Sequence, residues 1–205
     1  MKSAVTGLTA IMAAIIFVVV GIIGWSVGRG AVSSQGTVAV QAQTTAPTHV
    51  YLTVATPDML KTDVGPAVLP SAATVPANSD VTVTIMNFDD ATPLTGAYTK
   101  FAIAAGIAGK FTTVTVNRAN PNGPATAPAQ TLAADDPAIV SHTFTIPSLH
   151  LNVPLLASSR TTFTFHTGAA GTFEWHCQDP CGTGPAGWSG AMSHQGYMGG
   201  ELTVA

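Results

Sequence analysis

Residues 160–177, RTTFTFHTGAAGTFEWHC, alternate apolar and polar side chains on both sides of a Gly-containing turn. Side chains two positions apart on a β-strand point to the same face of the sheet. One face of the two strands therefore collects Thr161, Phe163, Phe165, Phe173, Trp175 and Cys177. Because this face is the apolar one, we expect it to line the core, with His166 and His176 facing outward. The stretch predicts two β-strands and brings a cysteine thiol to the core end of the second.

Five other segments share this alternation and are rich in Val, Thr and Phe. They are residues 49–56, 79–88, 111–116, 141–146 and 200–205. Several short strands separated by Pro or Gly indicate an all-β sandwich or barrel. Residues 89–138 break the regular spacing, and we interpret them as an insertion at one end of the sandwich that includes a short helix.

The N-terminal region has the composition of a membrane anchor. No charged residue lies between Lys2 and Arg29, and residues 8–25 form an apolar run. A bilayer-spanning helix needs about 20 such residues, whereas the apolar part of a cleaved signal peptide is about 7 to 15 residues long. We therefore expect residues 1–29 to be a single transmembrane helix, with a cleaved signal as the alternative.

The remainder of the chain divides into a linker and one domain. Residues 30–47 are small, polar and almost uncharged, which is typical of a flexible linker. Residues 48–205 are the domain, which we expect on the periplasmic or extracellular side of the cell membrane. The chain has 7 Lys and Arg against 10 Asp and Glu, a formal net charge of −3. This acidic balance disfavours nucleic acid as a partner and favours a basic redox protein.

Soft metal ligands are concentrated near the C-terminus. Cys177 ends the strand at 171–177, and the second cysteine of the chain, Cys181, lies with Met192, His194 and Met198 between this strand and the last one. His142 shares its strand face with Phe144 and Ile146, so we expect its imidazole to point into the core near this loop. Thiolate, thioether and imidazole are donors suited to copper, whereas calcium or magnesium would require a cluster of oxygens. Structural zinc sites seldom use methionine, so copper is the expected metal.

The order of these residues resembles the cupredoxin family over residues 48–205. The resemblance rests on SHTFTIPSLHLNVPL at 141–155, FTFHTGAAGTFEWHC at 163–177, and the later His and Met. It implies a Greek-key β-sandwich that binds copper and transfers electrons. In a mononuclear type 1 site of this family, the ligands would be His142, Cys177, His194 and Met198.

The motif CQDPCG, residues 177–182, is similar to the Cys-x-Glu-x-Cys-Gly motif of cytochrome c oxidase subunit II. That resemblance implies a binuclear copper A centre in which Cys177 and Cys181 bridge two coppers. His142 and His194 would each bind one copper, Met198 would be a weak ligand, and Asp179 would contribute its carbonyl oxygen. The two copper sites differ chiefly in the role of Cys181.

The family resemblance implies a function in electron transfer. The expected partners are a redox donor, such as a cytochrome c or another cupredoxin, and a membrane respiratory complex, with substrate chemistry left to that complex. Two other interpretations stay open. A disulfide between Cys177 and Cys181 would leave an exported, non-redox sandwich acting in adhesion or complex assembly, and a copper chaperone would bind Cu(I) without cycling.

Overall fold

The computed structural model describes residues 48–117, 119, 125, 128–184 and 186–205. The predicted anchor at 1–29 and the predicted linker at 30–47 lie outside the described residues. Within the described part of the chain, no helix is both long enough and apolar enough to cross a bilayer.

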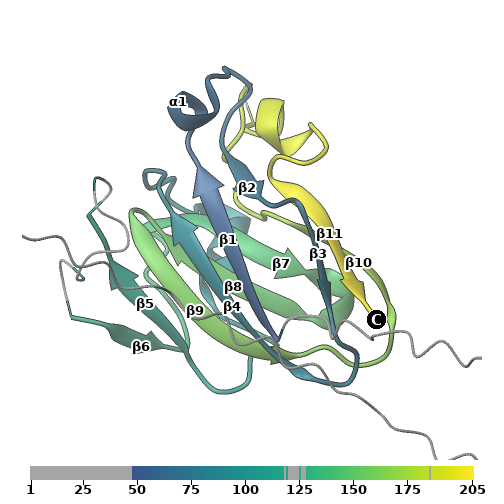
Figure 1. The fold of residues 1–205 in the computed structure, drawn as a ribbon. Coiled ribbons are helices and arrows are strands. Elements are labelled where there is room, and N and C mark those ends of the chain that lie inside the picture. Colours follow the sequence, from purple (N-terminus) through teal and green to yellow (C-terminus); the bar gives the residue numbers. More distant parts are fainter. Residues whose placement is uncertain (1–47, 118, 120–124, 126–127, 185) are drawn as a thin grey trace, which may run out of the picture. The chain divides into compact units, whose positions relative to one another are not determined.

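The described residues form two β-sheets, which Figure 1 shows facing each other. The first sheet has the order β2-β1-β4-β9-β5-β6, and the second has the order β3-β11-β10-β7-β8. Strands of the first sheet are β1 (His49–Ala55), β2 (Ala67–Leu69), β4 (Asp80–Asn87), β5 (Phe111–Thr115), β6 (Gln130–Leu132) and β9 (Ser159–His166). Those of the second are β3 (Ala72–Val75), β7 (Val140–Ile146), β8 (Leu151–Leu156), β10 (Gly171–His176) and β11 (Gly199–Val204). Most neighbouring strands pair antiparallel, but β1 runs parallel to β4 and β3 runs parallel to β11.

Four short helical segments connect the strands. They are the α-helix α1 (Pro57–Leu60) and the 3-10 helices η1 (Gly96–Ala102), η2 (Pro147–Leu149) and η3 (Gly190–Met192). The backbone N–H of Ala191 donates to the carbonyl of Val64 at 2.8 Å, which ties the loop carrying η3 to the segment between α1 and β2. Figure 1 shows α1 and this yellow loop at the same end of the sandwich.

The core lies between the two sheets and contains the residues that the alternation places on the inner face. Phe144 of β7 lies 5.4 Å from Trp175 and 6.1 Å from Phe163, measured between ring centroids. Phe163, Phe165, Trp175 and Cys177 are all buried, and Phe173 is half-buried against the same cluster. His166 is exposed, and His176 is half-buried. Each strand predicted from alternation is present, which confirms the β-sandwich.

Strand β8 is not among the predicted strands: every one of its residues is buried, as in β7, but its sequence LNVPLL lacks the apolar and polar alternation that predicts β7. A strand buried on both faces has no polar side to alternate with its apolar side. Pro154 nevertheless fits there, because β8 is the edge strand of its sheet and one side of an edge strand needs no ladder partner.

The predicted insertion at 89–138 contributes to both the fold and a second, smaller core. Its strands β5 and β6 extend the first sheet beyond β9. Its 3-10 helix η1 covers a cluster of Leu94, Ala102, Val140 and Leu156, against which Tyr98 and Phe101 pack. The side-chain amide of Asn152 donates to the carbonyls of Phe101 (2.9 Å) and Ile103 (2.8 Å), which fixes the end of η1 against β8.

Candidate metal centre

Three predicted ligands meet where β7 begins and β10 ends. The ligand atoms of His142, Cys177 and Cys181 all lie within 4.8 Å of one another. His142 belongs to β7, whereas the two cysteines follow β10, and His176 of β10 pairs with Thr145 of β7. The pairing of these two strands therefore brings the imidazole and the sulfurs together. The cluster has the donor types, two sulfurs and one nitrogen, that copper prefers.

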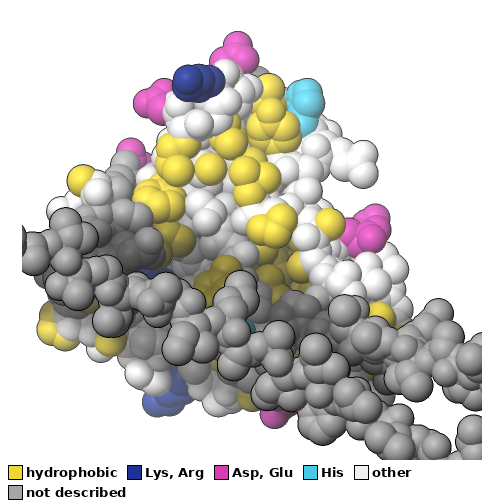
Figure 2. Space-filling view, in the orientation of Figure 1, with side chains coloured by type: hydrophobic (Ala, Val, Ile, Leu, Met, Phe, Trp, Pro, Cys, Tyr) yellow, Lys and Arg dark blue, Asp and Glu magenta, His cyan; other side chains and the backbone are white. Residues whose placement is uncertain are grey.

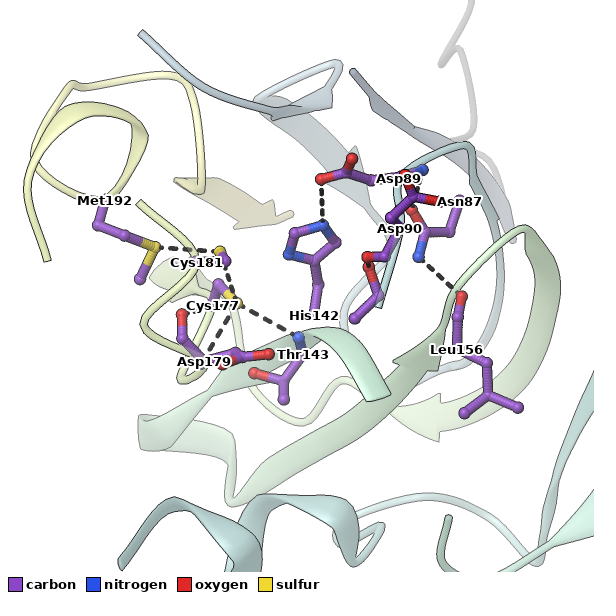
Figure 3. Close-up of polar contacts among 11 residues, drawn as sticks. Asn87, Asp89, Asp90, His142, Thr143, Leu156, Cys177, Asp179, Cys181 and Met192 are labelled. Atoms are coloured by element: carbon purple, nitrogen blue, oxygen red, sulfur yellow. Dashed lines mark hydrogen bonds and ion pairs between the residues drawn. The ribbon is translucent and has the colours of Figure 1, made fainter. Parts of the chain in front are cut away.

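His142 is fully buried, and its two ring nitrogens have different surroundings. Nε2 lies 3.1 Å from Oδ2 of Asp89, while Nδ1 has no hydrogen-bond partner among the residues that the structure describes. Figure 3 shows the ring between Asp89 on one side and the cysteine sulfurs on the other. A buried imidazole nitrogen without a partner is costly, so Nδ1 is placed to bind a cation once it has released its proton.

The Cys177 sulfur is held by backbone donors. The N–H groups of Thr143 and Asp179 each donate to Sγ at 3.3 Å. Burial raises the pKa of Cys177, but the contact with Cys181 and the nearby His142 imidazolium outweigh it and hold the pKa well below its usual value. Burial has the opposite effect on His142 and lowers its pKa, but the contacts with Asp89 and Cys177 outweigh burial and raise this pKa to about 9. Both shifts favour a thiolate and imidazolium pair in the metal-free protein.

Cys181 completes the cluster from a half-buried position. Its Sγ lies 3.8 Å from Sγ of Cys177 and 3.4 Å from Sδ of Met192. The adjacent Cys177 thiolate and burial both raise the pKa of Cys181, so its sulfur donates to Cys177 as a thiol in the absence of metal. Neither cysteine forms a disulfide in the structure.

Met192 is a sulfur donor that the sequence analysis left outside the ligand set. Its position depends on how the loop after Cys181 folds. The N–H of Gly182 donates to the carbonyl of Gly187 at 2.8 Å, and Thr183 and Ser189 exchange backbone hydrogen bonds of 3.0 and 3.1 Å. The loop therefore doubles back as a narrow hairpin, and a Cβ at Gly182 would collide with the Ser189 carbonyl oxygen and the Met192 side chain. In the sequence, the only sign that Met192 is a donor is its sulfur in the loop after Cys181. Its closeness to Cys181 appears only when this turn has formed.

The other three predicted ligands surround the cluster without joining it. Met198 is buried, and its carbonyl accepts the Cys177 N–H at 2.9 Å. Asp179 has its carbonyl oxygen 3.5 Å from the Cys177 sulfur. His194 is exposed, and its Nδ1 is 2.8 Å from the carbonyl of Gly190. The structure thus brings His142 and the two cysteines together, and the ligand roles of the other three remain predictions.

A cleft of about 570 Å³ opens over this region. Cys177, Met192, His194 and Met198 all line it, together with Trp188 and residues of β10 and β11. The cleft gives a metal or a partner access to the sulfur side of the cluster. His194 and Cys177 thus line the same cleft.

Asp179 gives a pH-dependent test of the buried site. Both of its carboxylate oxygens are buried without a hydrogen-bond partner in the described part of the chain. Burial and then the Cys177 thiolate raise the pKa of Asp179 from 3.8 to about 7. Since the folded state holds this proton more tightly, its contribution to stability is complete below pH 3.8 and is lost as the pH rises through about 7. We expect Asp179→Asn to flatten this fall in the free energy of unfolding of the metal-free protein.

The measurement is urea unfolding at several pH values between about 4 and 8 with a chelator present. Asp63→Asn, at an exposed carboxylate, is the matched control and should keep the wild-type slope. An unchanged slope in Asp179→Asn would mean that this carboxyl is solvated.

Comparisons with known proteins add little beyond this geometry. No family model and no curated protein matches the chain. Among solved structures, it is similar to a dithionite-reduced auracyanin from Roseiflexus castenholzii, with 20% identity, coverage of 78% of this chain and 98% of that chain, and a TM-score of 0.35. It is also similar to auracyanin A, a "blue" copper protein from Chloroflexus aurantiacus (16% identity, 77% and 98% covered, TM-score 0.34), and to reduced rusticyanin (19% identity, 77% and 76% covered, TM-score 0.33). At such low identities and TM-scores the likeness carries no argument, so the function rests on the residues themselves.

Proposed function

We propose that residues 48–205 are a cupredoxin-like copper domain that transfers electrons. The observation that carries this proposal is the fully buried His142: a ring nitrogen lies within 4.8 Å of two cysteine sulfurs, and Nδ1 lacks a hydrogen-bond partner among the described residues. One imidazole nitrogen and two sulfurs fit copper better than any hard cation.

Copper bound here would supply the redox chemistry, because it takes up and releases single electrons. The protein supplies three donor side chains, those of His142, Cys177 and Cys181, that are already close together. Thr143 and Asp179 fix the Cys177 sulfur through their N–H groups, and Asp89 fixes the His142 ring. Because these contacts form without metal, the ligands need little rearrangement, which suits electron transfer better than substrate turnover.

The position of Cys181 bears on the number of coppers. In a mononuclear type 1 site Cys181 has no role, whereas in a binuclear copper A-like site both sulfurs bind. Cys181 lies in the cluster, 3.8 Å from the Cys177 sulfur. This distance favours the binuclear site, with Met198, His194 and the Asp179 carbonyl as the further ligands that the resemblance to subunit II implies.

The partners and location follow from the sequence. Residues 1–29 would anchor the domain in the cell membrane, on the periplasmic or extracellular side, next to a respiratory complex. A cytochrome c or another cupredoxin would be the redox donor. Figure 2 shows hydrophobic side chains gathered below α1 and beside β2. Met59 of α1 and Leu69 of β2 are 52% and 38% exposed. An apolar surface near the cleft suits such a transient partner.

The test is reconstitution of the full chain in detergent with Cu(II). We expect one or two coppers per chain, an intense visible thiolate-to-copper absorption, and reversible bleaching by dithionite. Electron spin resonance then separates one copper from a mixed-valence pair. A colourless protein in which thiol titration finds no free cysteine would overturn the proposal and leave the disulfide-linked sandwich. Copper binding without reversible cycling would instead indicate a chaperone.

A further inference from the structure

Asp89 is the one carboxylate that contacts a candidate copper ligand through its side chain in the described part of the chain. It follows β4 in the first sheet, whereas His142 lies on β7 in the second sheet. Their Oδ2 to Nε2 distance is 3.1 Å, and the Asp89 side chain is 22% exposed. The contact therefore links the two sheets directly behind the metal centre.

The position of Asp89 is fixed by the turn to which it belongs, as Figure 3 shows. Asn87 is buried at the end of β4, and its side chain accepts the N–H of Asp89 at 2.9 Å while donating to the Leu156 carbonyl at 2.7 Å. The N–H of Ser158 donates to the Asp89 carbonyl at 3.2 Å. The hydroxyl of Ser141, adjacent to His142, donates to the carbonyl of Asp90 at 2.5 Å. These bonds attach the turn to both sheets. The backbone of Asp89 is therefore held in place, and the position of the carboxylate is set by this backbone as well as by the side-chain rotamer.

An imidazole can bind metal through only one nitrogen while the other carries the proton. The group that accepts the proton decides which nitrogen is left with the lone pair. Here the acceptor faces Nε2, so Nδ1 is the nitrogen that faces the two sulfurs. A carboxylate acceptor also raises the basicity of the ring, and a more basic ligand stabilises the more highly charged metal ion.

We propose that Asp89 is the positioning residue of the copper centre: it fixes the Nε2–H form of His142 and thereby favours Cu(II) over Cu(I). This inference rests on the proposed copper function and deepens it, because it assigns control of the reduction potential to a residue outside the ligand set. Asp89 would hold no copper itself, and its influence would pass through the His142 ring.

The decisive variant is Asp89→Asn in the full chain, which keeps the size of the side chain and an oxygen acceptor but removes the charge. Because Asp89 is partly exposed, this variant is expected to fold. Loss of such an outer partner typically weakens metal affinity by about 10- to 100-fold. We expect Cu(II) to bind about 10- to 100-fold more weakly and Cu(I) affinity to change little. Each tenfold difference then raises the reduction potential by about 59 mV.

Asp80→Asn is the matched control, because Asp80 also pairs with a histidine, His166, at 3.0 Å, but on the exposed surface. It should leave the potential and the Cu(II) affinity at wild-type values. Asp89→Glu keeps a carboxylate and should restore most of the Cu(II) affinity that Asp89→Asn loses, which a purely structural role for Asp89 would not produce.

The outcomes separate this inference from the proposed function. If the wild-type chain binds no copper with thiolate absorption, the proposed function itself fails. If the wild type is coloured but Asp89→Asn keeps its potential and its Cu(II) affinity within twofold, copper is bound and the role of Asp89 is refuted. If Asp89→Asn does not fold, Asp89→Glu decides. A wild-type reduction potential in Asp89→Glu supports the inference. A reduction potential about 59 mV or more above the wild-type value, although the carboxylate is kept, refutes it.

Discussion

Replacing Cys177 with serine is expected to abolish the intense visible absorption of the copper-loaded protein completely. The absorption arises from charge transfer between a thiolate sulfur and copper, and a serine hydroxyl stays protonated and is a poor ligand for that metal. The fold should survive, because serine is nearly the same size and its oxygen can accept the same N–H groups of Thr143 and Asp179. The measurement combines copper quantitation, the visible spectrum and far-ultraviolet circular dichroism.

Cys181→Ser is the matched variant, because it changes the same atom in the partner cysteine. In the binuclear site, copper content should fall from two to one per chain, and the mixed-valence resonance signal should disappear. An unchanged spectrum and one copper per chain in both wild type and Cys181→Ser would establish the mononuclear site. If Cys177→Ser kept its colour, Cys181 would be the principal thiolate, and the ligand assignment would have to be revised.

The core side of the metal centre was predictable because strand periodicity is a strict geometric rule. Alternation alone placed His142 and Cys177 on the inner face, and both are buried in the structure. The two cysteines are separated by only three residues, so any turn after β10 keeps them close. Local sequence patterns therefore led to the three residues whose ligand atoms come together.

The surroundings of that cluster were not predictable from local patterns. Asp89 lies in the segment that breaks the strand spacing, and only the pairing of β4 with β9 and the packing of the two sheets bring it to His142. Met192 depends on a hairpin whose hydrogen bonds join residues on both sides of a glycine-rich loop. The rotamer of His194, which bonds to the Gly190 carbonyl in the structure, is likewise set by tertiary contacts.

Replacing His142 with alanine is expected to remove the colour under either copper model and also to destabilise the metal-free protein. The ring is fully buried, so its removal leaves a cavity between the ends of β4 and β7. It also removes the imidazolium that balances the Cys177 thiolate, for which burial is unfavourable. Together, the cavity and the unpaired charge should lower the free energy of unfolding by about 2 to 4 kcal/mol.

Denaturant unfolding with a chelator present measures this loss, and copper titration measures the second effect in the same preparation. His166→Ala is the matched control, since its ring is exposed on β9 and pairs only with Asp80 among the described contacts. It should keep both the colour and the stability to within about 0.5 kcal/mol. Because stability and colour are measured separately, a stable but colourless His142→Ala would still assign the ligand. A fully coloured His142→Ala would show that copper reaches the cysteines without this imidazole, and the site would then have to be rebuilt around His194.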